Sequence, residues 1–278
     1  MSSAPAVRRL VITADDFGMA DPVNEAIEIA ASQGVLTAAS LMVGAPAAAD
    51  AVRRAGRLPY LHVGLHLVLT DGRPVLAPER IPHLVGEDGR FHDNMALAGV
   101  AMFLHPAARA ELAAEITAQF QAFAATGLTL DHVNAHKHFH LHPTICGLAL
   151  AIGRRFGARA MRAPCDPDRR VSLSEPFARL VKMRAARAGL LTPDRVFGLA
   201  WSGAMSTERL ENLIRTLPSG LSEIYLHPAT TGDFAGAAAG YRYGDELTAL
   251  TSPSVAAAVG ARGVELGGFG DFAAMGSR

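Results

Sequence analysis

Short apolar runs alternate with amphipathic stretches along most of the chain. The first apolar run, RRLVITA at residues 8–14, has the length and continuous hydrophobicity of a buried β-strand. Asp21 and Pro22 then suit the cap and first position of a helix that runs to Gly34. The same succession of strand and helix repeats towards the C-terminus, so the pattern predicts a series of β–α units.

The further predicted strands are short, apolar and bounded by turn residues, and they cover residues 35–43, 61–69, 128–135, 158–164, 195–200, 222–228 and 263–268. The further predicted helices carry apolar positions at a helical period, and they cover residues 46–56, 106–125, 143–157, 174–188, 206–217 and 243–259. Residues from about 70 to 106 show neither period and are rich in Gly and Pro, so we expect a long loop insertion there.

A strand-then-helix rhythm of about seven units predicts a mostly parallel sheet covered by helices. We expect one α/β domain spanning residues 1–278, folded as a distorted (β/α) barrel of about seven parallel strands that is closed or incomplete. A doubly wound open sheet is the alternative fold. The glycine-rich fingerprint that favours such a sheet is missing after the first strand.

The charge balance bears on the class of partner. Lys plus Arg number 26 and Asp plus Glu also number 26, so the formal net charge is zero. Because nucleic-acid binding requires a basic surface, we expect no nucleic-acid partner. Two cysteines cannot build a disulfide scaffold, and neither a signal peptide nor an apolar run of ~18 residues is recognisable. These features predict a cytoplasmic protein with no membrane-spanning helix.

Polar side chains stand where five of the predicted strands end, and they are Asp15, Asp16, His66, His136, Arg162 and His227. In parallel α/β folds the carboxyl ends of the strands form the edge at which ligands bind. Imidazoles and a carboxylate are a common ligand set for a catalytic divalent ion that keeps a position open for water. The sequence therefore predicts a metal-dependent site at this edge.

The adjacent carboxylates place a condition on that site. Neighbouring residues of a regular strand point to opposite faces, so Asp15 and Asp16 can both serve only if the chain bends between them. Phe17 and Gly18, which follow directly, permit such a bend. One carboxylate could then bind metal while the other acts as a base.

Five of the chain's 11 histidines lie in one tract, DHVNAHKHFHLHP, at residues 131–143. The tract could contribute one ligand to a metal centre, store metal by itself, or be polar decoration of a loop. A metal-binding module without catalytic activity would require the tract to bind ions alone, whereas a catalytic centre would need ligands from distant strands as well.

Several segments resemble the YdjC-like carbohydrate deacetylases, and the similarity is closest to the hopanoid-biosynthesis-associated branch, HpnK. The segments are TADDFG, SLMV, GLHLVLTDGRPV, DHVNAHKHFHLHP and YLHP, in that order. The resemblance covers the chain from Leu10 to about Leu250. It implies a distorted (β/α) barrel that removes N-acetyl groups from amino sugars with the help of one divalent ion, Mg²⁺ or Zn²⁺.

Carried over by motif, the resemblance implies that Asp16, His66 and His136 bind the metal and that Asp15 is the general base. Relatives often have Asp-Ser directly before the first histidine of the tract, whereas this chain has Asn134 and an alanine there. The histidine itself is kept, so we still expect metal binding.

The resemblance also suggests roles for residues around the ligands. His227, in the YLHP motif, is the candidate general acid, and Arg162 is expected to orient the catalytic carboxylate or the substrate. His138 and His140 are expected to line the sugar pocket or to support His136. Relatives often carry a glycine after the HP of this motif, where this chain has Ala229.

The hopanoid branch implies an N-acetylglucosaminyl hopanoid lipid as the substrate, with acetate and a free amine as products. It also implies peripheral contact with the inner membrane, and the family as a whole suggests a homodimer. Soluble chito-oligosaccharides or other N-acetylated sugars are the alternative substrates. Amidohydrolase-type barrels usually show His-x-His on the first strand, and the two aspartates at that position argue against them.

Overall fold

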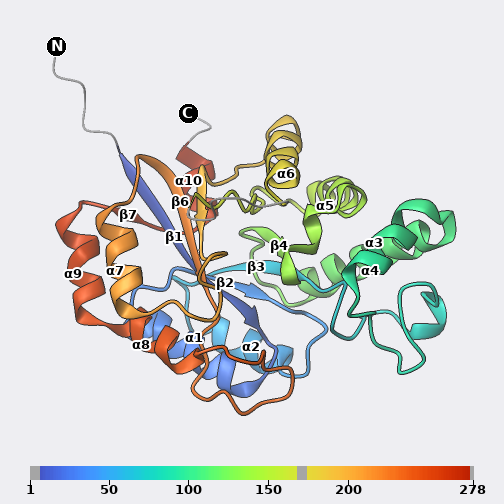
Figure 1. The fold of residues 1–278 in the computed structure, drawn as a ribbon, viewed down its shortest axis with the longest axis horizontal. Helices are drawn as coiled ribbons and strands as arrows, with labels where there is room; N and C mark the ends of the chain where they lie inside the picture. Colours follow the sequence, from blue (N-terminus) through green and yellow to red (C-terminus); the bar gives the residue numbers. More distant parts are fainter. Residues whose placement is uncertain (1–6, 168–173, 276–278) are drawn as a thin grey trace.

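A seven-stranded, all-parallel sheet forms the centre of the computed structural model, which describes residues 7–167 and 174–275 (Figure 1). The strands are β1 Arg8–Phe17, β2 Ala38–Leu41, β3 His62–Leu67, β4 Val133–Ala135, β5 Arg195–Phe197, β6 Gly220–Leu226 and β7 Glu265–Leu266. Their order is β4-β3-β2-β1-β6-β5, and β7 pairs with β1. Strands β1 to β4 follow one another in space as in the sequence, β5 lies next to β6, and β6 returns to β1, as in a barrel, so the predicted distorted (β/α) barrel is confirmed.

The gap between the two ends of this sheet is spanned by the segment predicted as a strand at residues 158–164. Met161 bridges to Val133 of β4, and on the other side the backbone N–H of Val196 in β5 donates to the carbonyl oxygen of Cys165. Only isolated bridges form, so the segment is extended but is not a regular strand. The barrel is therefore irregular at this point.

Helices cover the outside of the sheet (Figure 1). They are α1 Asp21–Gln33, α2 Ala48–Ala55, α3 Met95–Leu104, α4 Pro106–Ala125, α5 Pro143–Arg155, α6 Glu175–Arg187, α7 Thr207–Arg215, α8 Tyr243–Thr251, α9 Pro253–Ala261 and α10 Phe269–Met275, with 3₁₀ turns η1 Pro78–Arg80 and η2 His136–Leu141. No helix among residues 7–167 and 174–275 has the length and apolarity needed to cross a bilayer.

The expectation of a loop throughout residues 70–106 is wrong for its second half, where α3 forms. The sequence of α3, MALAGVAMFL, is apolar all round and lacks the one-sided period on which the prediction of helices relied. Two of its described side chains, Val100 and Leu104, are exposed. The first half of the segment is irregular except for η1, as expected.

Strand β1 bends at the carboxylate pair. Asp16 has a left-handed backbone with φ of 63°, and the pairing register between β1 and β2 shifts between Ala14 and Phe17. Such an irregularity re-aims the side chains that follow it. Asp15 and Asp16 can therefore face the same site. The bend that this arrangement requires is present.

Helix α10, which the sequence pattern did not predict, closes the amino-terminal end of the barrel. Its Phe269 and Phe272 are buried in a small apolar cluster with residues near the strand starts, such as Val11 and Leu221. The larger core lies between the sheet and the other helices. The barrel is thus plugged with aromatic rings at the end opposite the predicted site.

The irregular segment before α3 is held to helix α4 by a buried carboxylate. Glu115 is fully buried and accepts the backbone N–H groups of Val75 at 2.9 Å and Leu76 at 3.0 Å. It also accepts the amide of Gln119 at 2.8 Å. These bonds satisfy the loop backbone where no strand pairs with it.

We predict that Glu115→Ala lowers the free energy of unfolding by about 2–4 kcal/mol, because the loop N–H groups lose a charged acceptor. Urea denaturation would measure the loss. Gln121→Ala, at an exposed position of the same helix, is the matched control and should change stability by less than about 0.5 kcal/mol. Equal stability of the two variants would show that Glu115 does not anchor the loop.

Candidate active site

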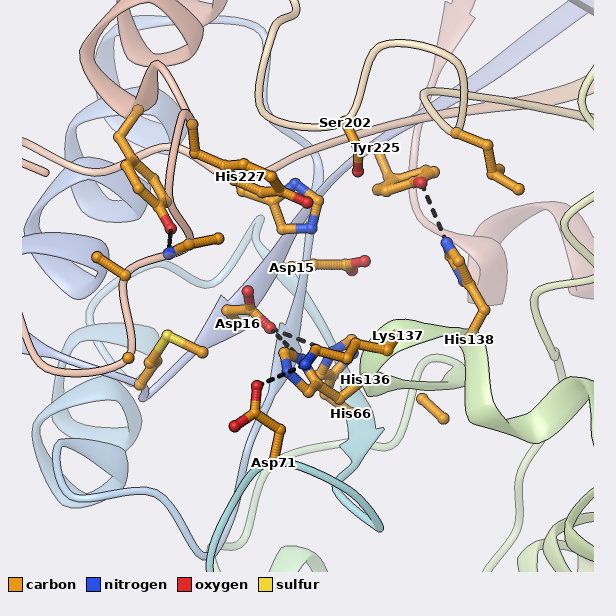
Figure 2. A pocket seen from close by; sticks show the side chains of 18 residues that line it. Asp15, Asp16, His66, Asp71, His136, Lys137, His138, Ser202, Tyr225 and His227 are labelled. Carbon is orange, nitrogen blue, oxygen red and sulfur yellow. Dashed lines mark hydrogen bonds and ion pairs between the residues drawn. The ribbon is translucent and has the colours of Figure 1, made fainter. Parts of the chain in front are cut away.

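A cavity of about 500 Å³ opens at the carboxyl-terminal ends of the strands (Figure 2). Six of the residues predicted for the site line it, namely Asp15, Asp16, His66, His136, His138 and His227. They come from β1, β3, η2 and the loop after β6, which are far apart in the sequence. The fold thus brings the predicted polar residues of four segments to one place.

Asp16, His66 and His136 form a compact group of potential metal ligands. Asp16 Oδ1 lies 3.0 Å from His136 Nδ1 and 3.3 Å from His66 Nε2. One ligand atom from each of the three residues lies within 4.8 Å of the others. Among the described residues this is the group of His, Cys, Asp and Glu side chains with metal-binding geometry, and the histidine tract contributes only His136 to it.

The chemistry of this group fits a divalent ion. His66 Nδ1 lies 2.7 Å from Asn134 Oδ1, so Nδ1 donates its proton there and Nε2, which faces Asp16, is the nitrogen available to bind an ion. Burial alone would raise the pKa of Asp16, but His136 and His66 hold it well below its usual range. An ionised carboxylate and two imidazoles suit zinc by softness, and the fourth position of a tetrahedral site remains for water.

Backbone strain gathers around the same cavity. Outside glycine, the described residues with left-handed φ are Asp16, Asp71, Lys137 and His138, with φ between 50° and 63°. All four line the cavity. Since this conformation is costly for residues with a Cβ, its concentration at one cavity indicates a functional constraint on that cavity.

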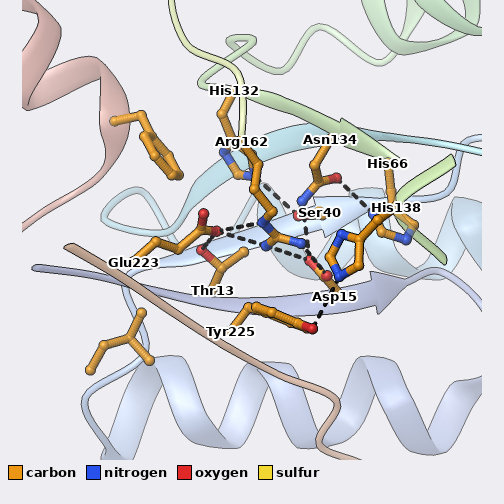
Figure 3. Close-up of polar contacts among 12 residues, drawn as sticks. Thr13, Asp15, Ser40, His66, His132, Asn134, His138, Arg162, Glu223 and Tyr225 are labelled. Carbon is orange, nitrogen blue, oxygen red and sulfur yellow. Dashed lines mark hydrogen bonds and ion pairs between the residues drawn. The ribbon is translucent and has the colours of Figure 1, made fainter. Parts of the chain in front are cut away.

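Asp15 is held by a fully buried arginine (Figure 3). Arg162 Nη1 donates to Asp15 Oδ2 at 2.5 Å and Nη2 donates to Oδ1 at 3.0 Å, while Nε and Nη2 donate to Glu223 Oε1 at 3.0 and 2.6 Å. Burial alone would raise the pKa of Asp15, but the guanidinium and His66 hold it below its usual range. The two carboxylates in turn raise the pKa of Arg162. Asp15 is therefore ionised and fixed in orientation.

The hydrogen bonds to Asp15 also distinguish its two oxygens. Oδ1 accepts from Arg162 Nη2 and, at 3.2 Å, from Asn134 Nδ2, which occupies both of its lone pairs. Among the side chains of the described residues, only Arg162 donates to Oδ2. Oδ2 is thus the oxygen with capacity to accept a further proton.

His227 lies across the cavity from the metal-ligand group, beyond Asp15, whereas His138 lies to one side of it, next to Tyr225 (Figure 2). The backbone N–H of His227 is held by the buried carboxylate of Glu246 at 2.5 Å, and its ring lies 5.6 Å from that of Tyr225. His138 Nε2 lies 3.0 Å from the Tyr225 hydroxyl. Burial, with Arg162 nearby, lowers the pKa of His138 well below its usual range, so its ring is neutral.

His140 and Arg162 lie behind the cavity and do not line it. His140 Nε2 is 2.9 Å from the carbonyl oxygen of Arg162, and burial lowers the pKa of His140 to about 4. Its neutral ring therefore donates to the backbone that carries the arginine. His140 therefore does not line the cavity, and its hydrogen bond supports the backbone of Arg162 rather than the ring of His136.

Several polar residues of this region were not predicted from the sequence. Glu223 and Tyr225 share a face of β6 with His227, because residues two apart on a strand point the same way. That alternation could have identified both. Ser40 and Lys137 carried no comparable signal, since one lies within an apolar strand and the other is hidden among the histidines of the tract.

Comparison with known proteins gives consistent matches. Residues 9–261 match the family model described as YdjC-like protein. The carbohydrate deacetylase of Geobacillus stearothermophilus is 33% identical over 264 residues, which cover 93% of this chain and 96% of the relative. The carbohydrate deacetylase of Thermoanaerobacter pseudethanolicus is 26% identical over 227 residues, covering 82% and 83%. A solved protein from Enterococcus faecalis V583, named for cellobiose-phosphate cleavage, is 27% identical with a TM-score of 0.78, covering 96% and 99%.

We predict that the chain binds one Zn²⁺ or Mg²⁺ per molecule and that Asp16→Asn and His66→Gln each weaken binding by more than about 100-fold, because each removes a ligand. Competition with a chromophoric chelator would measure the affinity. His92→Gln, at an exposed histidine, is the control and should bind like the original chain. Retention of full affinity by both ligand variants would place the metal elsewhere.

Proposed function

The chain belongs to the YdjC-like protein family, and from that premise we propose that it is a metal-dependent carbohydrate deacetylase. It hydrolyses the N-acetyl group of an acetylated amino sugar to acetate and a free amine. The observation that carries this proposal is the convergence of Asp16, His66 and His136 beside the arginine-held carboxylate of Asp15 in one cavity. A ligand group next to a fixed ionised carboxylate is what hydrolysis of an amide requires.

Asp16, His66 and His136 would hold the ion, which when bound polarises the acetyl carbonyl and lowers the pKa of water. Asp15 accepts a proton from the attacking water at Oδ2, the oxygen left with a free lone pair. Arg162 keeps that carboxylate aimed at the cavity while this happens. The low pKa of Asp15 keeps its carboxylate ionised, and therefore without a proton, at neutral pH.

His227 is the proposed proton donor to the departing amine. It lies across the cavity from the ligand group, and Glu246 fixes its backbone. When the C–N bond breaks, the nitrogen takes this proton and leaves as the free amine, while the water oxygen remains with the acetyl carbon. His138, neutral and bonded to Tyr225, is positioned to contact the sugar instead.

A second pocket of about 170 Å³, lined mostly by apolar side chains, adjoins the active-site cavity and shares Met19, Asp71 and Gly236 with it. Its other walls include the apolar Met42, Ala45 and Val68, and also the charged Arg73 and Arg90. An apolar space next to a polar sugar site suits a sugar joined to an apolar group. It supports an N-acetylglucosaminyl hopanoid as the substrate, the finer assignment that the sequence motifs suggest.

Contact with the inner membrane and a homodimer belong to the same proposal, because a lipid-linked sugar must be reached at a bilayer and the family resemblance suggests a dimer. A soluble chito-oligosaccharide is the competing substrate. It would occupy the polar cavity and leave the apolar pocket empty.

Asp15→Asn tests the assignment of the base. We predict that it lowers kcat for acetate release by about 10²–10⁴-fold, because the amide cannot accept the proton of the attacking water. The affinity for the metal should stay within about threefold, since Asp15 is not one of the ligands. Asp233→Asn, at an exposed carboxylate, is the control and should keep full activity. Near-original kcat in the Asp15 variant would mean that another group is the base.

Ala45→Glu tests the apolar pocket. We predict at least a tenfold loss of kcat/KM for an N-acetylglucosaminyl hopanoid, because the variant places a carboxylate against the apolar group. Activity on soluble N-acetylglucosamine oligomers should be unchanged. Ala49→Glu, at an exposed position four residues away, should affect neither substrate. If the Ala45 variant keeps its activity on the lipid, or the original chain prefers the soluble oligomer, the hopanoid assignment is wrong while the deacetylase proposal survives.

A further inference from the structure

We propose that a one-way chain of hydrogen bonds runs through the barrel from the metal ligand His66 to the buried carboxylate of Asp131, and that it sets the strength of His66 as a ligand. The chain passes through Asn134, Ser40 and His132 (Figure 3). These are positioning residues for the metal site, and the inference rests on the proposed function in so far as that function needs the ion.

The direction of the chain is fixed first at Asn134. Its Nδ2 donates to Ser40 Oγ at 2.8 Å and to Asp15 Oδ1 at 3.2 Å. Because the ionised carboxylate of Asp15 can only accept, the amide nitrogen must face it and the amide oxygen must face His66. His66 therefore donates from Nδ1 to Asn134 Oδ1, at 2.7 Å.

The next two links follow from the Asp131 end. His132 Nδ1 lies 2.9 Å from Asp131 Oδ2, and because a carboxylate oxygen can only accept, Nδ1 carries the proton of a singly protonated ring. His132 Nε2 is then an acceptor. Ser40 Oγ, which accepts from Asn134, donates its own proton to His132 Nε2 at 3.0 Å. With one proton on each ring, a single arrangement of protons satisfies all four bonds.

Asp131 anchors the far end of the chain. Its oxygens accept the backbone N–H groups of Phe269 at 3.2 Å and Gly270 at 2.7 Å, at the start of α10. Burial alone would raise the pKa of Asp131, but His132, His62 and the Gly270 N–H hold it below its usual range. The anchor is therefore an ionised carboxylate, fixed by the helix that plugs the barrel.

The ring of His132, in the middle of the hydrogen-bond chain, occupies space that is left by a glycine in the neighbouring strand. A Cβ at Gly64 of β3 would stand 2.5 Å from the ring of His132, so no other residue fits at Gly64 without displacing that ring. Gly64 pairs with Ser40, and His66 pairs with Asn134, in the adjacent strands. His132, Ser40 and Asn134 are all fully buried. The chain is a packed element of the interior rather than a chance contact.

The physical consequence concerns the ligand nitrogen of His66. Each donor in a one-way chain is polarised by the next, and the chain ends on a negative charge. An imidazole that donates its second N–H into such a chain keeps one tautomer and is a more basic ligand. Asp131, at the end of the barrel opposite the site, thus influences the metal affinity of His66 through the hydrogen-bond chain.

Ser40→Ala tests the chain with the smallest change. It breaks two links at once, and we expect it to weaken Zn²⁺ binding by about 10–100-fold, the usual loss when an outer partner of a metal ligand is removed. His132→Phe should give a similar loss. Ser222→Ala is the matched control, because Ser222 is also buried in the sheet and its hydroxyl has no hydrogen-bond partner among the described residues. It should bind Zn²⁺ like the original chain.

A second measurement needs no variant. In the original Zn²⁺-loaded protein, ¹⁵N NMR of the imidazoles should show the proton of His66 on Nδ1 and the proton of His132 also on Nδ1. A proton on His132 Nε2, or unchanged Zn²⁺ affinity in a folded Ser40→Ala variant, would overturn the inference. If the Ser40 variant loses Zn²⁺ affinity but the original protein releases no acetate from any sugar, the proposed function is wrong and the inference about the hydrogen bonds still holds.

Discussion

The left-handed bend at Asp16 is the constraint on which the site depends. On a regular strand Asp15 and Asp16 would face opposite sides, and one of them would be lost to the helix layer. The bend costs backbone energy, since φ of 63° is unfavourable for a residue with a Cβ. The two imidazoles around Asp16 and the guanidinium on Asp15 stabilise it. The backbone strain at Asp16 is therefore what allows both carboxylates, Asp15 and Asp16, to face the same cavity.

The interior of this barrel is polar where most barrels pack aliphatic layers. Arg162, fully buried, is balanced by Asp15 on one side and Glu223 on the other, and its guanidinium lies over the ring of Tyr225. Buried charges of this kind are tolerated only when each has partners. Removing Arg162 would leave two buried carboxylates without a cation, so the polar interior supports the active-site carboxylate through this one arginine.

The ends of the strands could be predicted from the sequence, because a continuous apolar run indicates a buried strand. The polar residue that follows the run is then the one at the end of that strand. That is how Asp15, His66 and His136 were found, together with the parallel barrel. The segment at residues 158–164 has the composition of a strand, but its neighbours pair with it only at isolated positions. Helix α3 was missed because it is apolar on all sides. Ser40 and Asn134 gain their importance only from contacts across strands, which no local pattern encodes.

The central claim is that one divalent ion lies between Asp16, His66 and His136, next to Asp15. Anomalous diffraction from a crystal soaked with Zn²⁺ tests it most directly. We expect a single strong peak at about 2.0–2.2 Å from a carboxylate oxygen of Asp16, from His66 Nε2 and from His136 Nδ1. A peak on other histidines of the tract, or several peaks along it with none at Asp16, would contradict the account.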